Sequence, residues 1–200
     1  MVGVSAAMAQ NLKWEAVAGM NFAKINVPGY SSRIGFNVGL RGELELPSLY
    51  NGAYVNTAAL LSLKGASLDW GELGNGKKNA YFLEIPLHLG YKHEINNDIS
   101  LFGEFGPYFA IGLFGKTNTG SDIEDEMESH NTFDEFKRFD LGIGVRIGAE
   151  IKQKYSVSLG YDHGLLNCWK SEFWGEDEDD IDLVSSVKNQ NLYISLGYKF

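Results

Sequence analysis

The stretch that decides the fold is RFDLGIGVRIGAEI, residues 138–151, in which apolar residues occupy every second position from Phe139 to Ile151. Glycines and the charged residues Asp140, Arg146 and Glu150 stand between them. Successive side chains of an extended strand point to opposite faces, so a period of two sorts these residues onto two faces. The segment therefore predicts a strand with one apolar face and one face of small and charged residues.

The same alternation recurs in seven other segments, so we expect eight strands. These segments are residues 12–22, 33–46, 54–64, 81–92, 100–112, 155–162 and 191–200. Pro86 lies inside the fourth strand, where a proline normally marks a sheet edge or a bulge. The connections after the third, fifth and seventh strands are long and cover residues 67–79, 117–135 and 166–188. Those after the second, fourth and sixth are short, which is typical of an up-and-down antiparallel sheet.

The two faces differ sharply in charge. The apolar faces of all eight segments contain no Lys, Arg, Asp or Glu. The opposite faces carry both signs of charge, at Arg33, Arg41, Glu43, Glu45, Lys64, Glu84, Glu104, Arg138, Asp140, Arg146, Glu150, Asp162 and Lys199. His88 shares the polar face of its strand with Glu84 and Lys92. A soluble lipocalin-like barrel that binds a small apolar ligand would turn its apolar face inward and its charges to water.

Two features favour the inverse arrangement, with the apolar face outside. The polar faces are rich in glycine, and small residues suit the concave interior of a narrow barrel. On the apolar faces, aromatic residues collect near the strand ends, with Val, Leu, Ile and Ala between them. Two aromatic girdles around an apolar band are typical of a transmembrane barrel. The sequence therefore predicts an all-β protein, an eight-stranded antiparallel up-and-down transmembrane β-barrel.

The C-terminal segment NLYISLGYKF, residues 191–200, keeps the alternation up to its last residue. In lipid, an unpaired strand edge leaves backbone N–H and C=O groups without partners, at a cost of several kcal/mol each. We therefore expect this last strand to pair with the first and to close the barrel. Strands of about ten residues, at ~3.3 Å each and tilted by ~40°, span the ~25 Å apolar band of such a barrel.

Composition bounds the remaining possibilities. The 200 residues fit a single domain, and their formal net charge of −9 argues against nucleic acid as a partner. The lone cysteine, Cys168, cannot form an internal disulfide. No segment is long and apolar enough to predict a transmembrane helix. Ala7-Met8-Ala9 has the small-residue pattern that precedes signal-peptide cleavage, so residues 1–9 are expected to be a residual signal-peptide segment and residues 10–200 the barrel domain.

The sequence resembles the outer-membrane β-barrel family of Gram-negative envelopes, porin-like and PorT-like. The resemblance is carried by GMNFAKI, LEIPLHLGYK, GPYFAIGL, RFDLGIGVRIGAEI, SLGYDHGLLN and the terminal LYISLGYKF, and it covers residues 12–200. It implies a location in the cell outer membrane, among lipid and lipopolysaccharide, after assembly by the outer-membrane insertion machinery. It also implies that a terminal strand ending in an aromatic residue is the insertion signal, carried here by Tyr193, Gly197, Tyr198 and Phe200.

The inward charges favour a paired network that fills a narrow lumen, with a path for small solutes as the alternative. The acidic loops lack the spaced ligands of an EF-hand, so no metal or other cofactor is expected. A weaker hypothesis places a divalent cation at Asp177, Asp179, Asp180 and Asp182. His163 lies on the lipid side without a serine on its face of the strand, so an enzyme is not expected. The predicted role is structural or a surface interaction, such as adhesion or ligand contact, with an extracellular partner that the sequence leaves open.

Overall fold

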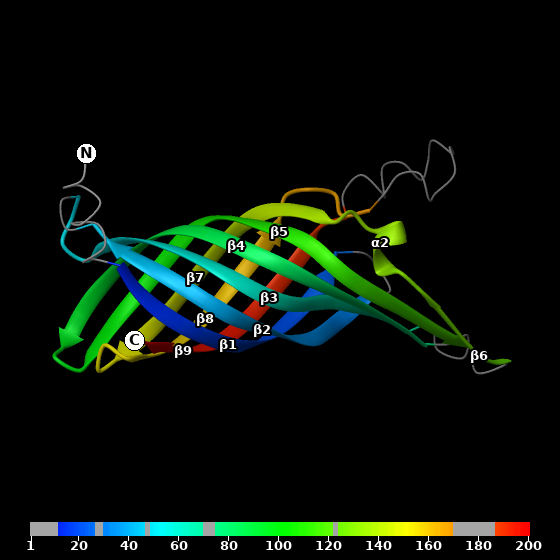
Figure 1. The fold of residues 1–200 in the computed structure, drawn as a ribbon, viewed down its shortest axis with the longest axis horizontal. Coiled ribbons are helices and arrows are strands. Elements are labelled where there is room, and N and C mark those ends of the chain that lie inside the picture. Colours follow the sequence, from blue (N-terminus) through cyan, green and yellow to red (C-terminus); the bar gives the residue numbers. More distant parts are fainter. Residues whose placement is uncertain (1–11, 27–29, 47–48, 70–74, 122–123, 170–186) are drawn as a thin grey trace.

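The computed structural model describes residues 12–26, 30–46, 49–69, 75–121, 124–169 and 187–200. In chain order its strands are β1 (Leu12–Ile25), β2 (Tyr30–Glu45), β3 (Ala53–Asp69), β4 (Asn75–Asn96), β5 (Ile99–Ser121), β6 (Glu124–His130), β7 (Phe139–Ile151), β8 (Tyr155–Gly164) and β9 (Asn189–Lys199). One short helix, α2 (Thr132–Glu135), lies between β6 and β7. Figure 1 shows the strands wound obliquely around a single elongated barrel.

Eight of these strands form a closed antiparallel barrel. Each pairs with its neighbours in the order β4-β3-β2-β1-β9-β8-β7-β5, and pairing of β4 with β5 completes the ring. β6 pairs only with the outer part of β5, through Thr117↔His130 to Ser121↔Glu124. The predicted eight-stranded antiparallel barrel is confirmed, and β6 is an extension of a hairpin beyond it.

The first and last strands form the seam of the barrel. Their register runs from Glu15↔Lys199 to Ile25↔Asn189. The backbone N–H of Phe200 donates to the carbonyl of Trp14 at 3.1 Å, so the pairing continues to the final residue. β1 begins and β9 ends at the end of the barrel that carries the tight turns at 97–98 and 152–154, here called the turn end (Figure 1). The opposite end, where α2 and β6 lie, is called the loop end.

Two expectations about local structure are corrected. The segment 117–135, predicted to be a loop, is built of the end of β5, the strand β6 and the helix α2. This hairpin extends beyond the apolar band, so neither of its faces needs to be apolar. The alternation of apolar and polar residues by which the other strands were predicted is therefore missing from its sequence. Pro86 lies in β4, which has a neighbour on each side and is no edge. The β3–β4 register is kept, but the ladder is interrupted between Thr57↔Leu87 and Leu60↔Glu84, since proline has no N–H to donate.

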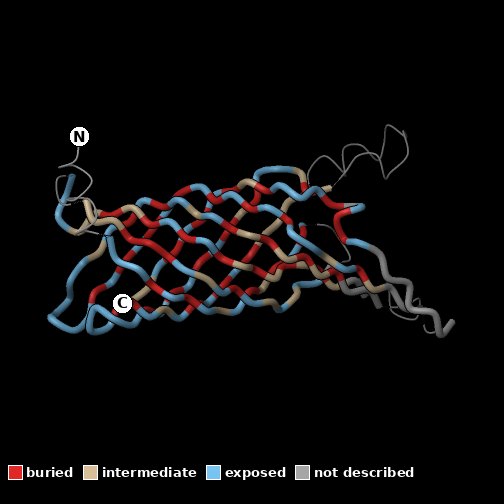
Figure 2. Tube along the Cα trace, viewed as in Figure 1, coloured by how far each residue is buried: buried red, intermediate tan, exposed pale blue. Residues whose placement is uncertain are grey.

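The outer surface of the barrel is apolar, as predicted. Along each strand, exposed and buried residues alternate (Figure 2). Exposed positions hold large side chains such as Leu40, Ile147 and Leu196. Aromatic residues gather towards both ends of this surface: Tyr155 and Tyr198 have ring centroids 5.6 Å apart at the turn end, and Tyr81 and Phe114 stack at 4.5 Å towards the loop end. The lipocalin-like alternative requires these residues to face inward and is therefore excluded.

Within the described residues, no helix is long and apolar enough to cross a membrane.

Candidate functional site

The lumen of the barrel holds the candidate functional residues. Because every second residue of a strand faces inward, charged and amide side chains from all eight barrel strands converge there. Eleven of the fourteen residues predicted to face the lumen are buried: Arg41, Glu43, Lys64, Glu84, His88, Glu104, Asp140, Arg146, Glu150, Asp162 and Lys199. Buried charges need partners and hydrogen bonds, so their pairing decides what the lumen can do. They form three groups along the barrel axis.

The first group lies in the lumen near the turn end and is called the turn-end cluster. It consists of Glu43, Lys92, Glu150 and Lys199, which come from four different strands. The Lys92 Nζ lies 2.7 Å from Glu43 Oε1 and 2.8 Å from Glu150 Oε2. The Lys199 Nζ lies 2.8 Å from Glu43 Oε2 and also pairs with Glu150. Each lysine thus bridges both glutamates, and the cluster is electrically neutral.

The second group lies above the turn-end cluster and contains two arginine–glutamate pairs. Glu104 receives the guanidinium of Arg146 through two hydrogen bonds, from Nε to Oε2 at 2.8 Å and from Nη2 to Oε1 at 2.5 Å. The hydroxyl of Tyr54 donates to Glu104 Oε1 at 2.8 Å. A bidentate pair of this kind is both strong and geometrically specific.

The second pair joins strands on the other side of the same level. The Arg41 Nη1 donates to Glu15 Oε2 at 2.7 Å, and the Ser156 hydroxyl donates to Glu15. Glu15 is absent from the predicted network, although the alternation places it opposite Trp14 and Ala16 and would have found it. His88 Nδ1 lies 3.6 Å from Glu104 Oε2 and so joins this level of the lumen.

The third group occupies the half of the lumen nearer the loop end, and it has more carboxylates than cations. Lys64 pairs with Glu84. Asp140 accepts hydrogen bonds from the Tyr108 hydroxyl at 3.1 Å and from the Asn189 amide at 3.0 Å. Asp162 accepts one from the Asn191 amide at 3.4 Å. Neutral donors therefore satisfy part of the negative charge at this level.

Large rings fill the space that the charged side chains leave. Tyr193 points inward from β9 opposite Gly160, and a Cβ at Gly160 would overlap its ring. Tyr108 likewise lies opposite Gly142, where a Cβ would overlap the Tyr108 ring. The glycines of the polar faces thus make room for inward tyrosines, which are 9% and 2% exposed.

Three predicted network residues lie elsewhere. Glu45 is at the rim of the turn end, where it pairs with Lys13 at 2.5 Å and both side chains are more than 40% exposed. Arg138 precedes β7 and is exposed; its guanidinium donates to the carbonyls of Gly112 and Leu113. Arg33 is partly buried, and two of its guanidinium nitrogens lack a hydrogen-bond partner among the described residues. All three lie near strand ends, where an alternating pattern no longer distinguishes lumen from rim.

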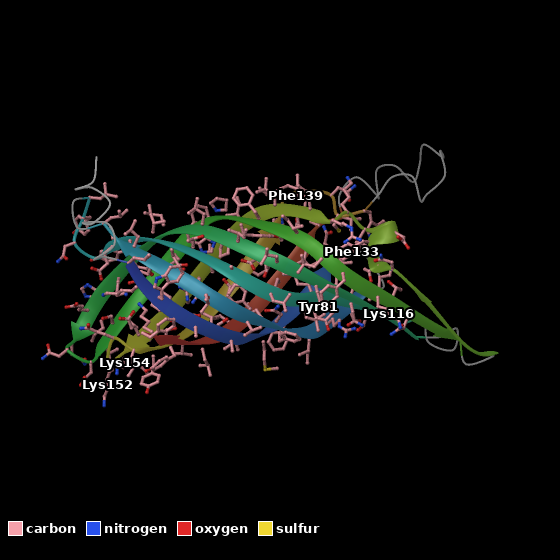
Figure 3. The ribbon with its side chains drawn as sticks, in the orientation of Figure 1. Tyr81, Lys116, Phe133, Phe139, Lys152 and Lys154 are labelled. Atoms are coloured by element: carbon pink, nitrogen blue, oxygen red, sulfur yellow. The ribbon has the colours of Figure 1, made fainter. Side chains whose placement is uncertain are left out.

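A buried apolar cluster, here called the plug, lies at the loop end of the barrel. It consists of Phe133, Phe136, Cys168, Trp169 and Val187, which come from three segments distant in the sequence. Asn131 caps α2, because its side chain accepts from the backbone N–H of Phe133 at 3.0 Å, and the helix directs Phe133 down onto Phe82. Figure 3 shows Phe133 beside α2 at the loop end.

Sequence reasoning missed the plug, although FDEF at 133–136 inside a polar stretch was a usable signal. Phe136 also packs edge-to-face on Trp169, with ring centroids 6.0 Å apart. Burial raises the pKa of the Cys168 thiol to about 12, so this cysteine stays a neutral thiol near pH 7.

The remaining predicted residues are placed as follows. Tyr193 and Gly197 face the lumen, whereas Tyr198 on β9 and Phe200, which follows it, are exposed on the outside. The four aspartates proposed for a divalent cation, Asp177, Asp179, Asp180 and Asp182, lie outside the described residues. Across the described part of the chain, no three His, Cys, Asp or Glu side chains are grouped so as to hold a metal ion.

A closed eight-stranded barrel with an apolar outer band, two aromatic girdles and a charged, occupied lumen defines a membrane-spanning β-barrel. A model of the outer membrane protein β-barrel domain matches residues 8–169 of this chain. The chain belongs to this family, and it is a protein of the cell outer membrane. The predicted family and location are confirmed.

The solved structures to which this chain is similar have low sequence identity to it. A major outer membrane protein from Thermus thermophilus is 16% identical, with a TM-score of 0.50 over 94% of this chain and 99% of that one. Neisserial surface protein A is 12% identical, with a TM-score of 0.47 over 95% and 97%. Ail of Yersinia pestis, solved with the heparin analogue sucrose octasulfate, is 17% identical, with a TM-score of 0.44 over 94% and 99%. A comparison with curated protein sequences gives no match.

Proposed function

We propose that this protein is a closed outer-membrane barrel with a structural or surface-contact role at its loop end, and that it neither conducts solutes nor catalyses a reaction. The observation that carries the proposal is the filling of the lumen. The turn-end cluster bridges four strands at one end, and the plug covers the other. Between them, paired arginines and inward tyrosines occupy the interior.

The pairing pattern supports a filled lumen over the small-solute porin. An aqueous channel needs charges that face water, whereas Glu104 and Arg146 have side chains that are 0% and 4% exposed. A pore would have to break these pairs, and removing one partner of a buried pair costs several kcal/mol. His163, the outward histidine, contacts Tyr161 at the level of the aromatic girdle, which supports an interfacial role for it.

Reconstitution in a planar bilayer tests the closed lumen. Purified wild-type protein is expected to give no discrete conductance steps, because the turn-end cluster and the plug both block the axis. Liposomes that contain it should also take up small sugars no faster than empty liposomes. A porin of known conductance, reconstituted in the same way, controls for insertion. Reproducible steps that scale with salt concentration would contradict the proposal and favour the porin.

We also propose that the loop end faces the cell exterior and the turn end faces the periplasm. The long connections gather at the loop end and the tight turns at the other, and Figure 3 shows Lys116 at the former and Lys152 and Lys154 at the latter. On this orientation, lipopolysaccharide surrounds the loop end. Insertion by the outer-membrane machinery, with Tyr198 and Phe200 as part of the signal, belongs to the same proposal.

Thiol labelling of intact cells tests the orientation. With a membrane-impermeant maleimide, Lys116→Cys is expected to label on intact cells, and Lys152→Cys only after the outer membrane is permeabilised. Both lysines are exposed, so accessibility differs only by the side of the membrane. The wild type is the blank, because its single thiol is buried and protonated. Labelling in the reverse order would overturn the proposed orientation.

A further inference from the structure

A small cavity lies inside the barrel, at the level of the third group of charges, and we call it the lumen cavity. Its volume is about 20 Å³. About 10–15 Å³ of such space is enough for one water molecule, so the cavity also has room for one small cation. Its polar lining comes from five strands, through Asn21, Asn37, Glu84, Asp162, Asn191 and Tyr193. All six side chains carry an oxygen atom.

Two carboxylates line the lumen cavity, and only one of them is balanced by an ion pair. Glu84 pairs with Lys64. Asp162 is buried and accepts a hydrogen bond from the Asn191 amide at 3.4 Å, but it forms no ion pair with any residue that the structure describes. Lys64 acts electrostatically on Glu84, Asp162 and the neighbouring Asp140 together. One lysine thus serves three buried carboxylates, which is unfavourable unless another positive charge is present.

An amide oxygen beside Asp162 also lacks a partner. Asn191 is paired with Asp162 in the β8–β9 register, lines the cavity and is 2% exposed. Its nitrogen donates to the Asp162 carboxylate, so its Oδ1 is the atom left over, and Oδ1 accepts no hydrogen bond from the described part of the chain. Asp140 Oδ1 is unpaired in the same way. Buried polar atoms are nearly always satisfied, and an unpaired oxygen needs either a donor or a cation.

The ligand set fits a monovalent cation better than a divalent one. Ca²⁺ and Mg²⁺ take six or more oxygen ligands, and no three His, Cys, Asp or Glu side chains of the described residues are grouped to hold such an ion. Here one uncompensated carboxylate stands among neutral amide and hydroxyl oxygens. Lys78 does not line the lumen cavity, because its ammonium lies over the Phe136 ring in the plug.

We propose that the lumen cavity binds one monovalent cation of the size of Na⁺, held by Asp162, Glu84 and the Oδ1 of Asn191. The ion balances the charge of Asp162 and gives the amide oxygen its partner. Because the three ligands come from strands β4, β8 and β9, the site exists only in the folded barrel. The ion is held and not conducted, so the site is independent of the surface role proposed above.

The dependence of stability on Na⁺ tests the proposal. The full chain is unfolded by urea in phosphatidylcholine vesicles, with Na⁺ exchanged for N-methyl-D-glucamine at constant ionic strength, since that cation is too large for the cavity. A ligand that binds only the folded state lowers the unfolding equilibrium constant in proportion to its concentration once the site is saturated. We expect about a tenfold fall for each tenfold rise in Na⁺, which corresponds to ~1.4 kcal/mol. An unfolding constant that does not change with Na⁺ would overturn the proposal.

Matched variants locate the ion. Asp162→Asn keeps the shape of the side chain but removes its charge, so the Na⁺ dependence should disappear. Glu45→Gln removes a carboxylate at the exposed rim of the turn end and should keep the wild-type dependence. If Asp162 had only a structural role, its replacement would change the stability equally at every Na⁺ concentration. An unchanged Na⁺ dependence in Asp162→Asn, or its loss in both variants, would overturn the site.

A proton is the competing occupant, and the same measurement at several pH values distinguishes it from Na⁺. It would be taken up by Asp162, on which Lys64, Glu84 and Asp140 act, or by His88, whose unpaired Nε2 borders Gly144 together with Asp162 Oδ1. If Na⁺ is the occupant, protons compete with it, and the Na⁺ dependence weakens as the pH falls. A stability that changes with pH but not with Na⁺ would show that protons balance the carboxylates and would overturn the cation site.

Discussion

Replacement of Arg146 by methionine is expected to lower the free energy of unfolding by about 3–5 kcal/mol, the usual cost of leaving one member of a buried ion pair without its partner. Glu104, whose side chain is 0% exposed, would then lose its bidentate partner and keep hydrogen-bonding distance only to the Tyr54 hydroxyl, with His88 at 3.6 Å and Arg41 further away. The methionine also gives up the contact of the guanidinium with the Phe102 ring, at 4.7 Å from its centroid. Urea unfolding in lipid vesicles, followed by tryptophan fluorescence, measures the change.

Two further variants show whether the cost arises from the uncompensated carboxylate. In Arg146→Met with Glu104→Leu, no charge is left alone, so most of the lost stability should return. Lys13→Met breaks the rim pair with Glu45, in which both side chains are more than 40% exposed, and should cost no more than about 1 kcal/mol. If the Arg146→Met barrel were as stable as the Lys13→Met barrel, the ion pairs of the lumen would have to be in contact with water. That result would contradict the proposed closed lumen.

Deletion of Phe200 is expected to reduce the amount of folded barrel in the outer membrane severalfold. The deletion removes the last backbone hydrogen bond of the seam, from Phe200 N–H to the Trp14 carbonyl, and an outward aromatic ring at the turn end. It also removes the residue proposed to end the insertion signal. The folded fraction in purified outer membranes is measured by gel migration of unheated and boiled samples.

The comparison with Phe105→Ala separates assembly from stability. Phe105 also faces outward, with 59% of its surface exposed against 72% for Phe200, but it lies inside β5 and not at the end of a strand. In vitro, both variants should refold into detergent micelles with similar yields. In cells, only the Phe200 deletion should lose folded protein. If both variants lost the same amount of folded protein in cells, the proposed insertion signal would be contradicted. A general loss of apolar surface would then explain the result.

The strands and their faces could be read from the sequence because lipid and lumen impose opposite demands on alternate residues. The outward run Ile34, Phe36, Val38 and Leu40 and the inward Asn37 and Arg41 follow that rule without exception. Which inward charges pair could not be read, because partners come from strands distant in the sequence. Glu43 and Glu150, for example, meet the same two lysines at the turn end. Whether these side chains lie at the same height in the lumen depends on how far neighbouring strands are shifted along each other. The alternation does not determine that shift.

The plug was missed for a different reason. Phe133 lies in the short helix α2 and Phe136 directly follows it, in a polar segment where no repeated pattern indicates burial. Trp169 and Val187 join them only because the connection between β8 and β9 returns to the same mouth. Such contacts depend on the three-dimensional course of the chain, whereas strand alternation depends on local geometry alone.

The seam between β1 and β9 has a consequence for how the chain folds. Its partners, such as Glu15 and Lys199, are separated by nearly the whole chain, so the entropy of closing that loop is lost before any seam contact forms. Until β9 arrives, β1 presents an unpaired edge that can pair with another chain and aggregate. Completion of the barrel is therefore a late and slow event. The longer the edge of β1 stays unpaired, the longer the chain needs protection from aggregation during export.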